Sequence, residues 1–336
     1  MDLKKTPSFK LNKISIILLS VMWVTNSNAS GYEVNGLATG TGSPIAIGGP
    51  GNMAKASGGY STSVGANSSA EGLVSSAFGD NAHAKGALST AIGHHAESAG
   101  KNSTSIGVWS TASGADTSAM GNKAKAAGDR STALGAAAEA TKADTAALGA
   151  AAKASGLKST ALGAGTSASG ESTSALGTAA KAAGDRSTAL GAAAEATKAD
   201  TAALGAAAKA SGLKSTALGA ESKATANGSV AIGSSSVANE ENTVSFGSDS
   251  HTRKLVNVSQ GIVAGDSTEA VNGAQLFAAN GTVASALGTS VDEAGNIVAP
   301  VYKVDGREVN SVGDALTSID DRTTKNTSSI TTLAGD

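Results

Sequence analysis

The stretch STALGAAAEATKAD (Ser131–Asp144) decides the fold, because it is one full period of a repeat that fills most of the chain. In each period a glycine follows a bulky apolar residue, and the next such pair comes fourteen residues later. The pairs keep this phase without a slip from Val64-Gly65 to Phe246-Gly247. A fixed short period predicts stacked, nearly identical coils of chain. A repeating rod offers a surface and a length, which favours a binding or structural role over a catalytic pocket.

The residues before the glycine of each pair, which we call the anchor glycine, alternate as in a β-strand. Serine or threonine stands four positions before every anchor glycine, and alanine or serine stands two positions before it. Successive side chains of a strand point to opposite faces. One face of this strand therefore carries a hydroxyl, an alanine and the glycine. The other face carries residues such as Thr132 and Leu134.

A second strand is expected after the anchor glycine. Small residues recur three and five positions after it, as at Ala138 and Ala140, and a charged residue such as Glu139 stands between them in most periods. This pattern predicts small side chains inside the coil and charge outside. Two short strands and two corners per period predict an all-β parallel β-roll over residues 30–247. Fourteen coils stacked about 4.8 Å apart would give a rod of roughly 65 Å.

A second glycine stands seven positions after most anchor glycines, as at Gly128 and Gly156. A corner that needs positive φ favours glycine, so we expect left-handed backbone at this position. Four residues interrupt the column, and their corners are expected to turn differently: Lys142, Lys198, Ala226 and Glu240. None of the coils is expected to carry an insertion.

The small interior makes the roll narrow and leaves the bulky column outside or half-buried. A continuous apolar stripe on a rod is a liability unless a partner covers it, so we interpret the stripe as a subunit interface. Its predicted members are Leu134, Leu148, Leu162, Leu176, Leu190, Leu204 and Leu218. Residues 124–164 and 180–220 are identical, which indicates that the length of the rod can vary without loss of function.

Composition and the N-terminus narrow the class of protein further. Aromatic residues make up 3% of the chain, cysteine is absent, and the net charge of −2 gives no reason to expect nucleic acid as a partner. Four lysines, an apolar run from Ile14 to Val24 and small residues before Ala29 are typical of an export signal, predicted to be cleaved after Ala29.

After Gly247 the pattern changes. Residues 248–287 are expected to form a linker and then a helix from about Thr268 to Leu287, with Asp266 as N-cap and Glu269 as its capping partner. Residues 288–311 indicate short strands at 296–299 and 301–304, with a hairpin turn at Asp305-Gly306. From residue 312 the three-four spacing of apolar residues predicts a coiled-coil seam that includes Ile319 and Ile330. Asn326 interrupts this seam, as a polar residue that fixes register would.

Together these segments resemble the trimeric autotransporter adhesins, the YadA-like surface proteins of Gram-negative bacteria. The coil Ser-Thr-Ala-Leu-Gly followed by Ala-x-Ala is similar to the family's head repeat. The stretches 253–258 (RKLVNV) and 266–276 (DSTEAVNGAQL) resemble its neck, which is the most specific part. Thr323-x-x-Asn326-Thr327 is similar to the stalk motif in which asparagines from three chains surround an anion, although Thr323 replaces the usual valine.

The resemblance implies a homotrimer of left-handed rolls, a neck, a coiled-coil stalk that begins at residues 312–336, and a C-terminal β-barrel anchor in the outer membrane that this chain would lack. It implies adhesion to host cells or to matrix proteins such as collagen, fibronectin or laminin, with autoaggregation as a further activity. A chloride or similar anion at Asn326 is the one non-protein group implied. The segment NGSVAIG at 227–233 resembles a collagen-contacting head repeat, so candidate ligand residues are Asn227, Ser229, Val230, Ala231, Ile232 and Gly233.

Three other interpretations stay open at this stage. An ice-binding β-solenoid would need outward hydroxyls two positions apart, whereas Ser131 and Thr132 are adjacent and point oppositely. A β-helical enzyme would need a cleft built by long loops, and a purely structural spacer would need no ligand at all. His94 and His95 are expected to point apart on the surface and to bind no metal, because no aspartate or cysteine accompanies them.

Overall fold

The computed structural model describes residues 36–49 and 51–335. The predicted export signal, residues 1–29, lies outside these ranges. The described chain divides into two compact units, one that ends at Arg253 and one that begins at Lys254. Each unit is treated by itself below.

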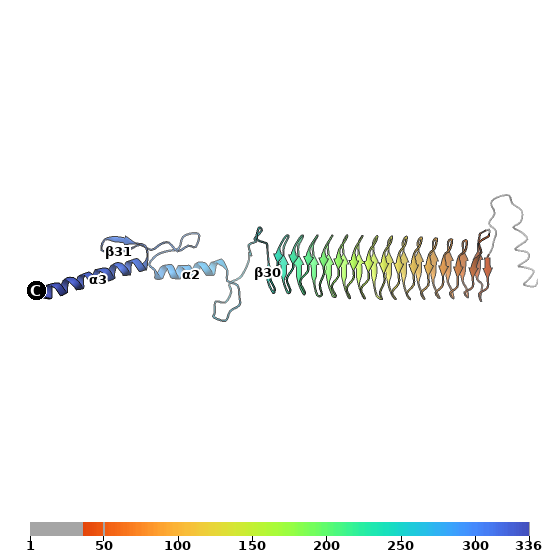
Figure 1. The fold of residues 1–336 in the computed structure, drawn as a ribbon, viewed down its shortest axis with the longest axis horizontal. Helices are drawn as coiled ribbons and strands as arrows, with labels where there is room; N and C mark the ends of the chain where they lie inside the picture. Colours follow the sequence, from red (N-terminus) through yellow and green to blue (C-terminus); the bar gives the residue numbers. More distant parts are fainter. Residues whose placement is uncertain (1–35, 50, 336) are drawn as a thin grey trace, which may run out of the picture. The chain divides into compact units, whose positions relative to one another are not determined.

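The first unit is a parallel β-solenoid whose coils follow one another in sequence order (Figure 1). Every coil gives one strand to each of two 15-stranded parallel sheets, sheet A from the odd-numbered strands and sheet B from the even-numbered ones. Sheet A contains β1 (Gly36–Ala38), β3 (Ala54–Ala56), β5 (Ser69–Ala70), β7 (His83–Ala84), β9 (Glu97–Ser98), β11 (Thr111–Ala112), β13 (Lys125–Ala126), β15 (Glu139–Ala140), β17 (Lys153–Ala154), β19 (Ser167–Ala168), β21 (Lys181–Ala182), β23 (Glu195–Ala196), β25 (Lys209–Ala210), β27 (Lys223–Ala224) and β29 (Val237–Ala238).

Sheet B holds the strands that precede the anchor glycines, and its register joins equivalent residues of successive periods, as Leu134 with Leu148. The predicted fourteen-residue β-roll is therefore confirmed. Sheet B contains β2 (Ile45–Ile47), β4 (Thr62–Val64), β6 (Ser76–Phe78), β8 (Thr90–Ile92), β10 (Thr104–Ile106), β12 (Ser118–Met120), β14 (Thr132–Leu134), β16 (Ala146–Leu148), β18 (Thr160–Leu162), β20 (Ser174–Leu176), β22 (Thr188–Leu190), β24 (Ala202–Leu204), β26 (Thr216–Leu218), β28 (Val230–Ile232) and β30 (Val244–Ser245).

The interior of the roll contains small side chains, as the column pattern predicts. Ala133, Ala138 and Ala140 are fully buried, and the bulkiest fully buried side chains of the described residues are threonines and serines. Interior hydroxyls close the corners by donating to the carbonyl three residues earlier, as Thr145 Oγ1 does to the Lys142 oxygen at 2.6 Å. A hydroxyl can be buried at this position because the carbonyl accepts its hydrogen bond.

The corners correct one prediction about glycine. The left-handed residues stand two and nine positions after the anchor glycine, for example His95 (φ 54°) and Asp144 (φ 57°), and the anchor glycines from Gly65 to Gly233 have positive φ. The glycines at plus seven do not. They allow close approach instead, since a Cβ on Gly156 would lie within 1.8 Å of the Gly170 oxygen. The corner that contains Lys142 turns through a left-handed residue, Asp144 (φ 57°), as the glycine corner does at Lys158 (φ 56°), so the expectation that it turns differently is wrong.

The roll begins before the regular phase does. Gly36 pairs with Ala54, and Ile45 pairs with Thr62, so the first coil spans 18 residues in sheet A and 17 in sheet B rather than fourteen. Gly49 and Asn52 form an antiparallel bridge within this longer coil. The expectation of coils without insertions therefore holds from Val64 onward and fails in the coil before it.

In the second unit, helix α2 spans Gly273–Ala286 and begins later than predicted. Its N-cap is Asn272, whose side chain accepts from Gln275 N at 3.2 Å while Gln275 Oε1 accepts from Asn272 N at 3.1 Å. The predicted N-cap at Asp266 with Glu269 as its partner is therefore wrong. The Glu269 carboxylate instead accepts a hydrogen bond from Ile262 N at 2.9 Å.

The remaining elements are a hairpin and a long helix. Strands β31 (Tyr302–Val304) and β32 (Arg307–Val309) pair antiparallel around Asp305 (φ 53°) and Gly306 (φ 74°), which confirms the predicted turn. The predicted strand at 296–299 is reduced to one bridge, between Val291 and Ile297. Helix α3 spans Val312–Gly335 and buries no residue. Among the described residues, no helix combines the length and the apolar character that a membrane crossing requires.

Candidate interaction surfaces

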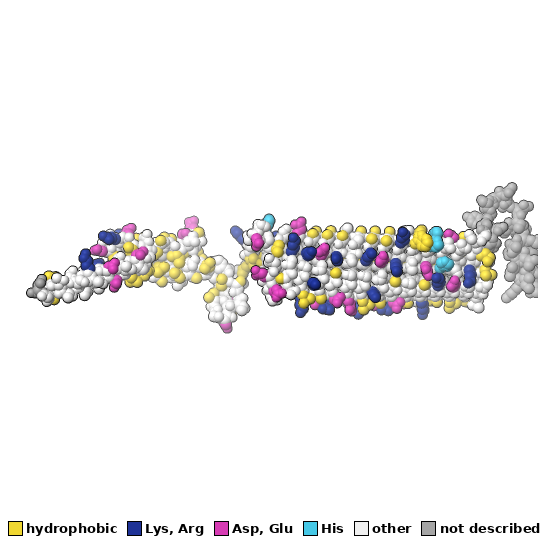
Figure 2. Space-filling model, in the orientation of Figure 1, with side chains coloured by type: hydrophobic (Ala, Val, Ile, Leu, Met, Phe, Trp, Pro, Cys, Tyr) yellow, Lys and Arg dark blue, Asp and Glu magenta, His cyan; other side chains and the backbone are white. Residues whose placement is uncertain are grey.

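The outer face of sheet B carries the apolar stripe, formed by the bulky residue before each anchor glycine. Leu134, Leu162, Leu190 and Leu218 are 43–45% exposed, and the alternate leucines Leu148, Leu176 and Leu204 are half-buried. Figure 2 shows rows of hydrophobic side chains that run along the roll. The predicted interface residues therefore share one face and stack in register. That other subunits cover this stripe stays a prediction.

The outer face of sheet A carries the predicted ladder of charge. Lys153 Nζ lies 3.8 Å from Glu139 Oε2, and Lys209 Nζ lies 3.1 Å from Glu195 Oε2. All four side chains remain at least 41% exposed. Exposed pairs of this kind contribute about 0.2–1 kcal/mol each and are screened by salt. Sheet A thus presents a polar face, in contrast to the apolar face of sheet B.

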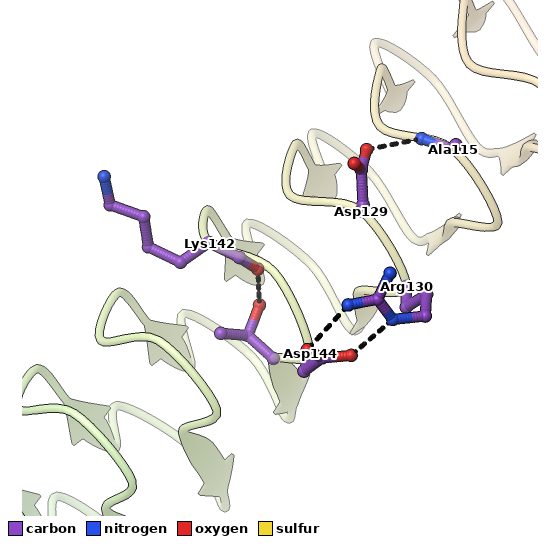
Figure 3. A network of polar contacts seen from close by, with 6 residues as sticks. Ala115, Asp129, Arg130, Lys142 and Asp144 are labelled. Atoms are coloured by element: carbon purple, nitrogen blue, oxygen red, sulfur yellow. Dashed lines mark hydrogen bonds and ion pairs between the residues drawn. The ribbon is translucent and has the colours of Figure 1, made fainter.

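The corner between sheet A and sheet B contains a polar network that joins successive coils (Figure 3). Arg130 donates two hydrogen bonds to the Asp144 carboxylate, at 2.6 and 2.8 Å, and Ala115 N donates to Asp129 Oδ1 at 2.9 Å. The Arg130 guanidinium lowers the pKa of Asp144 below its ordinary value, chiefly through the hydrogen bonds. The same bidentate contact recurs four coils later between Arg186 and Asp200.

The candidate ligand residues Asn227 and Gly233 lie outside the strands. Asn227 is exposed at a corner, where its Oδ1 accepts from Leu213 N at 2.9 Å and its Nδ2 donates to Glu241 Oε1 at 3.0 Å. Gly233 is an anchor glycine that faces the Arg253 guanidinium, and a Cβ built there would lie 2.9 Å from Arg253 Cζ. Asn227 is therefore the more accessible of the two.

The other four candidates belong to β28 or to the corner before it. Ser229 and Ala231 are fully buried, and the Ser229 hydroxyl donates to the Ala226 oxygen at 2.7 Å. Their side chains point into the roll, so a ligand on its surface would not reach them. Val230 and Ile232 are half-buried on the outer face of sheet B. Ile232 belongs to the apolar stripe, so a ligand and a subunit would compete for it.

The predicted coiled-coil residues all lie on α3. Ile319 is 42% exposed and Ile330 is 65% exposed, and Asn326 is exposed between them. An exposed apolar seam on a helix is typical of one helix of a coiled coil without its partner helices. The single chain tests neither the seam nor an anion at Asn326.

An aromatic cluster at the corner between sheet B and sheet A was missed by the sequence analysis. The rings of His94 and His95 stack with centroids 4.2 Å apart, and His95 stacks on Trp109 at 3.9 Å and 7°. The prediction that the two histidines point apart is wrong, because His95 sits in the left-handed corner conformation. The fourteen-residue spacing of His95 and Trp109 was the signal that could have revealed the stack. Among the described residues, no cluster of three or more histidine, cysteine, aspartate or glutamate residues could hold a metal ion.

These observations define a repeat-built parallel β-solenoid whose possible contacts lie on its outer faces and corners. The YadA head domain repeat (2 copies) matches over more than half of the chain, at residues 51–68, 56–82, 70–96, 84–108, 98–124, 112–138, 140–166, 168–194, 196–222 and 224–250. The chain therefore belongs to the YadA-like trimeric autotransporter adhesins, as the sequence resemblance implies.

Two known proteins can be compared with the chain directly. The autotransporter adhesin EhaG of Escherichia coli O157:H7 is 42% identical over 69 residues, which are 20% of this chain and 4% of EhaG. This chain thus corresponds to a small part of that relative. The crystal structure of the collagen-binding domain of the Yersinia adhesin YadA is 23% identical, with a TM-score of 0.25, over 71% of this chain and 98% of that domain.

Proposed function

We propose that this chain is the outward-reaching part of a bacterial surface adhesin, which attaches to host extracellular matrix or host cells and promotes autoaggregation. The observation that carries the proposal is the run of head repeats, which belongs to a family of adhesins rather than enzymes. The export pattern of residues 1–29 supports a place on the cell surface, with an anchor in the outer membrane supplied by a further segment of the protein.

The assembly that we propose is a homotrimer. The apolar stripe supports it, because stacked leucines such as Leu134 and Leu162 would otherwise stay in water. The apolar seam on α3, with Ile319 and Ile330, supports three helices in the stalk. In such a stalk, three copies of Asn326 would face one another and hold a chloride or similar anion.

Ligand contact in this proposal is multivalent. If sheet B faces the other subunits, then the corners and the outer face of sheet A are left to contact the matrix, and Asn227 lies on one of these corners. Weak contacts repeated along the coils and across three chains add through effective concentration. A long run of stacked, regular coils suits multivalent binding, since each coil presents nearly the same surface.

A solid-phase assay tests the proposal. The whole chain is applied to surfaces coated with collagen, fibronectin, laminin or albumin, and to cultured epithelial cells. We expect saturable binding to at least one matrix protein or to the cells, well above binding to albumin. Binding to none of them above albumin refutes the adhesin proposal. Light scattering of the same sample tests the assembly, and a monomer mass refutes the trimer.

A further inference from the structure

The aromatic cluster lies in a part of the roll that differs from the rest of the same corner. The positions one and two residues after the anchor glycine form this corner in every coil. In the coils that begin at Gly79, Gly93, Gly107 and Gly121 they hold Asp80-Asn81, His94-His95, Val108-Trp109 and Asn122-Lys123. Four of the later coils hold two alanines there, at 136–137, 150–151, 192–193 and 206–207. The fold itself therefore does not need the aromatic rings.

Backbone conformation argues against a structural role as well. His95 and Trp109 have φ of 54° and 60°, a region that bulky residues rarely adopt. Ala137 and Ala151 take up the same corner geometry, with φ of 54° and 55°. The left-handed conformation is therefore a property of this corner throughout the roll, and the corner does not need large rings to adopt it.

The aromatic cluster is partly exposed to solvent. Trp109 is 52% exposed although His95 covers one face of its indole. The exposed Lys123 follows Trp109 in the next coil, where its N donates to the Val108 oxygen at 2.8 Å. Val108, beside it, is 41% exposed. Figure 2 shows histidine and hydrophobic side chains side by side near the N-terminal end of the roll. An exposed indole with a polar surround is the kind of group that dominates binding interfaces.

The surround of the stack indicates the chemistry of the ligand. Asp80 and Lys123 balance in charge, and the Asp80 carboxylate lies 3.8 Å from His94 Nε2. Asn81 and Asn122 add amide donors and acceptors on either side. A balanced charge does not favour a polyanion. An exposed indole flanked by carboxylate and amide groups suits a sugar ring, whose C–H face packs on the indole while its hydroxyls reach the polar side chains.

We propose that the corner formed by Asp80, His94, His95, Val108 and Trp109 is a binding site for a neutral glycan. The site rests on the surface role proposed above, and it adds a carbohydrate ligand to the matrix or cell contacts. The stacked histidines hold the indole in place, and the sugar packs on the exposed part of Trp109. Because the head repeats in three chains, three such sites would act together on a glycan-coated surface.

Two titrations test the site on the whole chain. In a Trp23→Phe background, Trp109 is the one remaining tryptophan, so a shift of its emission on addition of sugar reports binding at this corner. Calorimetry measures the affinity of each variant. The probes are lactose, N-acetyllactosamine, chitotriose and mannotriose, with sialyllactose, heparin and a proline-rich peptide for comparison. We expect at least one neutral sugar to bind saturably and to shift the emission.

Matched variants separate the site from the fold. Trp109→Ala and His95→Ala copy the alanine corners of the later coils, so both should fold, and each should weaken binding of the sugar at least tenfold. Leu88→Ala is the control, because Leu88 has the same 52% exposure and a φ of 57° at the other corner. This control should bind like the unmodified chain.

Three results would overturn the proposal. The first is that no neutral sugar binds, or that Trp109→Ala binds it unchanged. The second is that only the anionic sugars or the peptide bind at this corner. The third is that Trp109→Ala changes the mass in light scattering, which would make the corner a subunit contact. If the unmodified chain binds matrix proteins but no neutral sugar, the glycan site alone is refuted. If it binds neither, the adhesin proposal is refuted as well.

Discussion

Substitution of the anchor glycine Gly149 by alanine should destabilise the roll strongly. Gly149 has φ of 133°, a region that residues with a Cβ rarely enter, and holding alanine there costs about 1–3 kcal/mol. A Cβ would also lie 2.5 Å from the Gly163 oxygen, whereas ordinary van der Waals contact begins at 3.4 Å. The two coils would have to move apart by roughly 0.9 Å, the difference between these two distances.

That movement would break backbone hydrogen bonds between the two coils. Gly163 N donates to the Leu148 oxygen at 2.8 Å at this point, and loss of this bond and a neighbour costs about 1 kcal/mol each. Strain and lost hydrogen bonds together give about 3–5 kcal/mol for Gly149→Ala. Urea denaturation followed by circular dichroism measures the change in the free energy of unfolding.

Gly165 provides the matched control in the next coil. Its φ is 65°, no heavy atom lies within 4 Å of a Cβ built there, and Ala151 and Ala179 hold the equivalent positions in the neighbouring coils. Gly165→Ala should therefore change stability by less than about 1 kcal/mol. Equal losses in the two variants would refute the argument that close approach of the coils, rather than glycine flexibility, fixes the anchor position.

Three further predictions concern assembly, pH and length. Lysine at both Leu148 and Leu162 should convert a trimer into a monomer in light scattering, while lysine at the exposed corner residue Ala136 should not. Because Arg130 lowers the pKa of Asp144, their contact stabilises the fold above the ordinary pKa of aspartate and is lost as the pH falls through the lowered value. Asp144→Asn should therefore lower the melting temperature at neutral pH, and this difference should shrink as the pH falls below the ordinary pKa of aspartate. Deletion of residues 165–220 removes 56 residues, four periods of fourteen, and should leave a folded roll shorter by about 19 Å in scattering. Deletion of residues 165–213 removes three and a half periods, so the coils on either side of the junction would be out of phase and the variant should not fold.

Alternation along one strand is a local property, and it predicted the inside and outside of the coil correctly. Ala133 is buried and Leu134 is exposed because a strand turns successive side chains to opposite faces. The corner glycines were misinterpreted because glycine serves either positive φ or close approach, and only the neighbouring coil distinguishes them. Gly156 is fixed by the backbone of Gly170, which is fourteen residues away.

Contacts between coils were predictable in principle from the period. Arg130 and Asp144 are fourteen residues apart, as are His95 and Trp109, so each pair occupies one column of the repeat. The start of α2 was harder to predict. Asp266 with Glu269 and Asn272 with Gln275 both have the spacing of a capping box, and the choice between them depends on contacts that the local sequence does not contain.

The direction of the ladder hydrogen bonds has a mechanical consequence. In a roll of stacked coils these bonds run along the long axis, so a pull on the two ends of the chain loads them directly and peels one coil at a time. Each coil contributes about 4.8 Å to the length of the rod, but its fourteen residues span about 48 Å when extended. The roll would therefore lengthen about tenfold per coil under load. In a single-molecule pulling experiment we expect equal steps of extension, which would let an attached rod absorb a sudden force before its contact breaks.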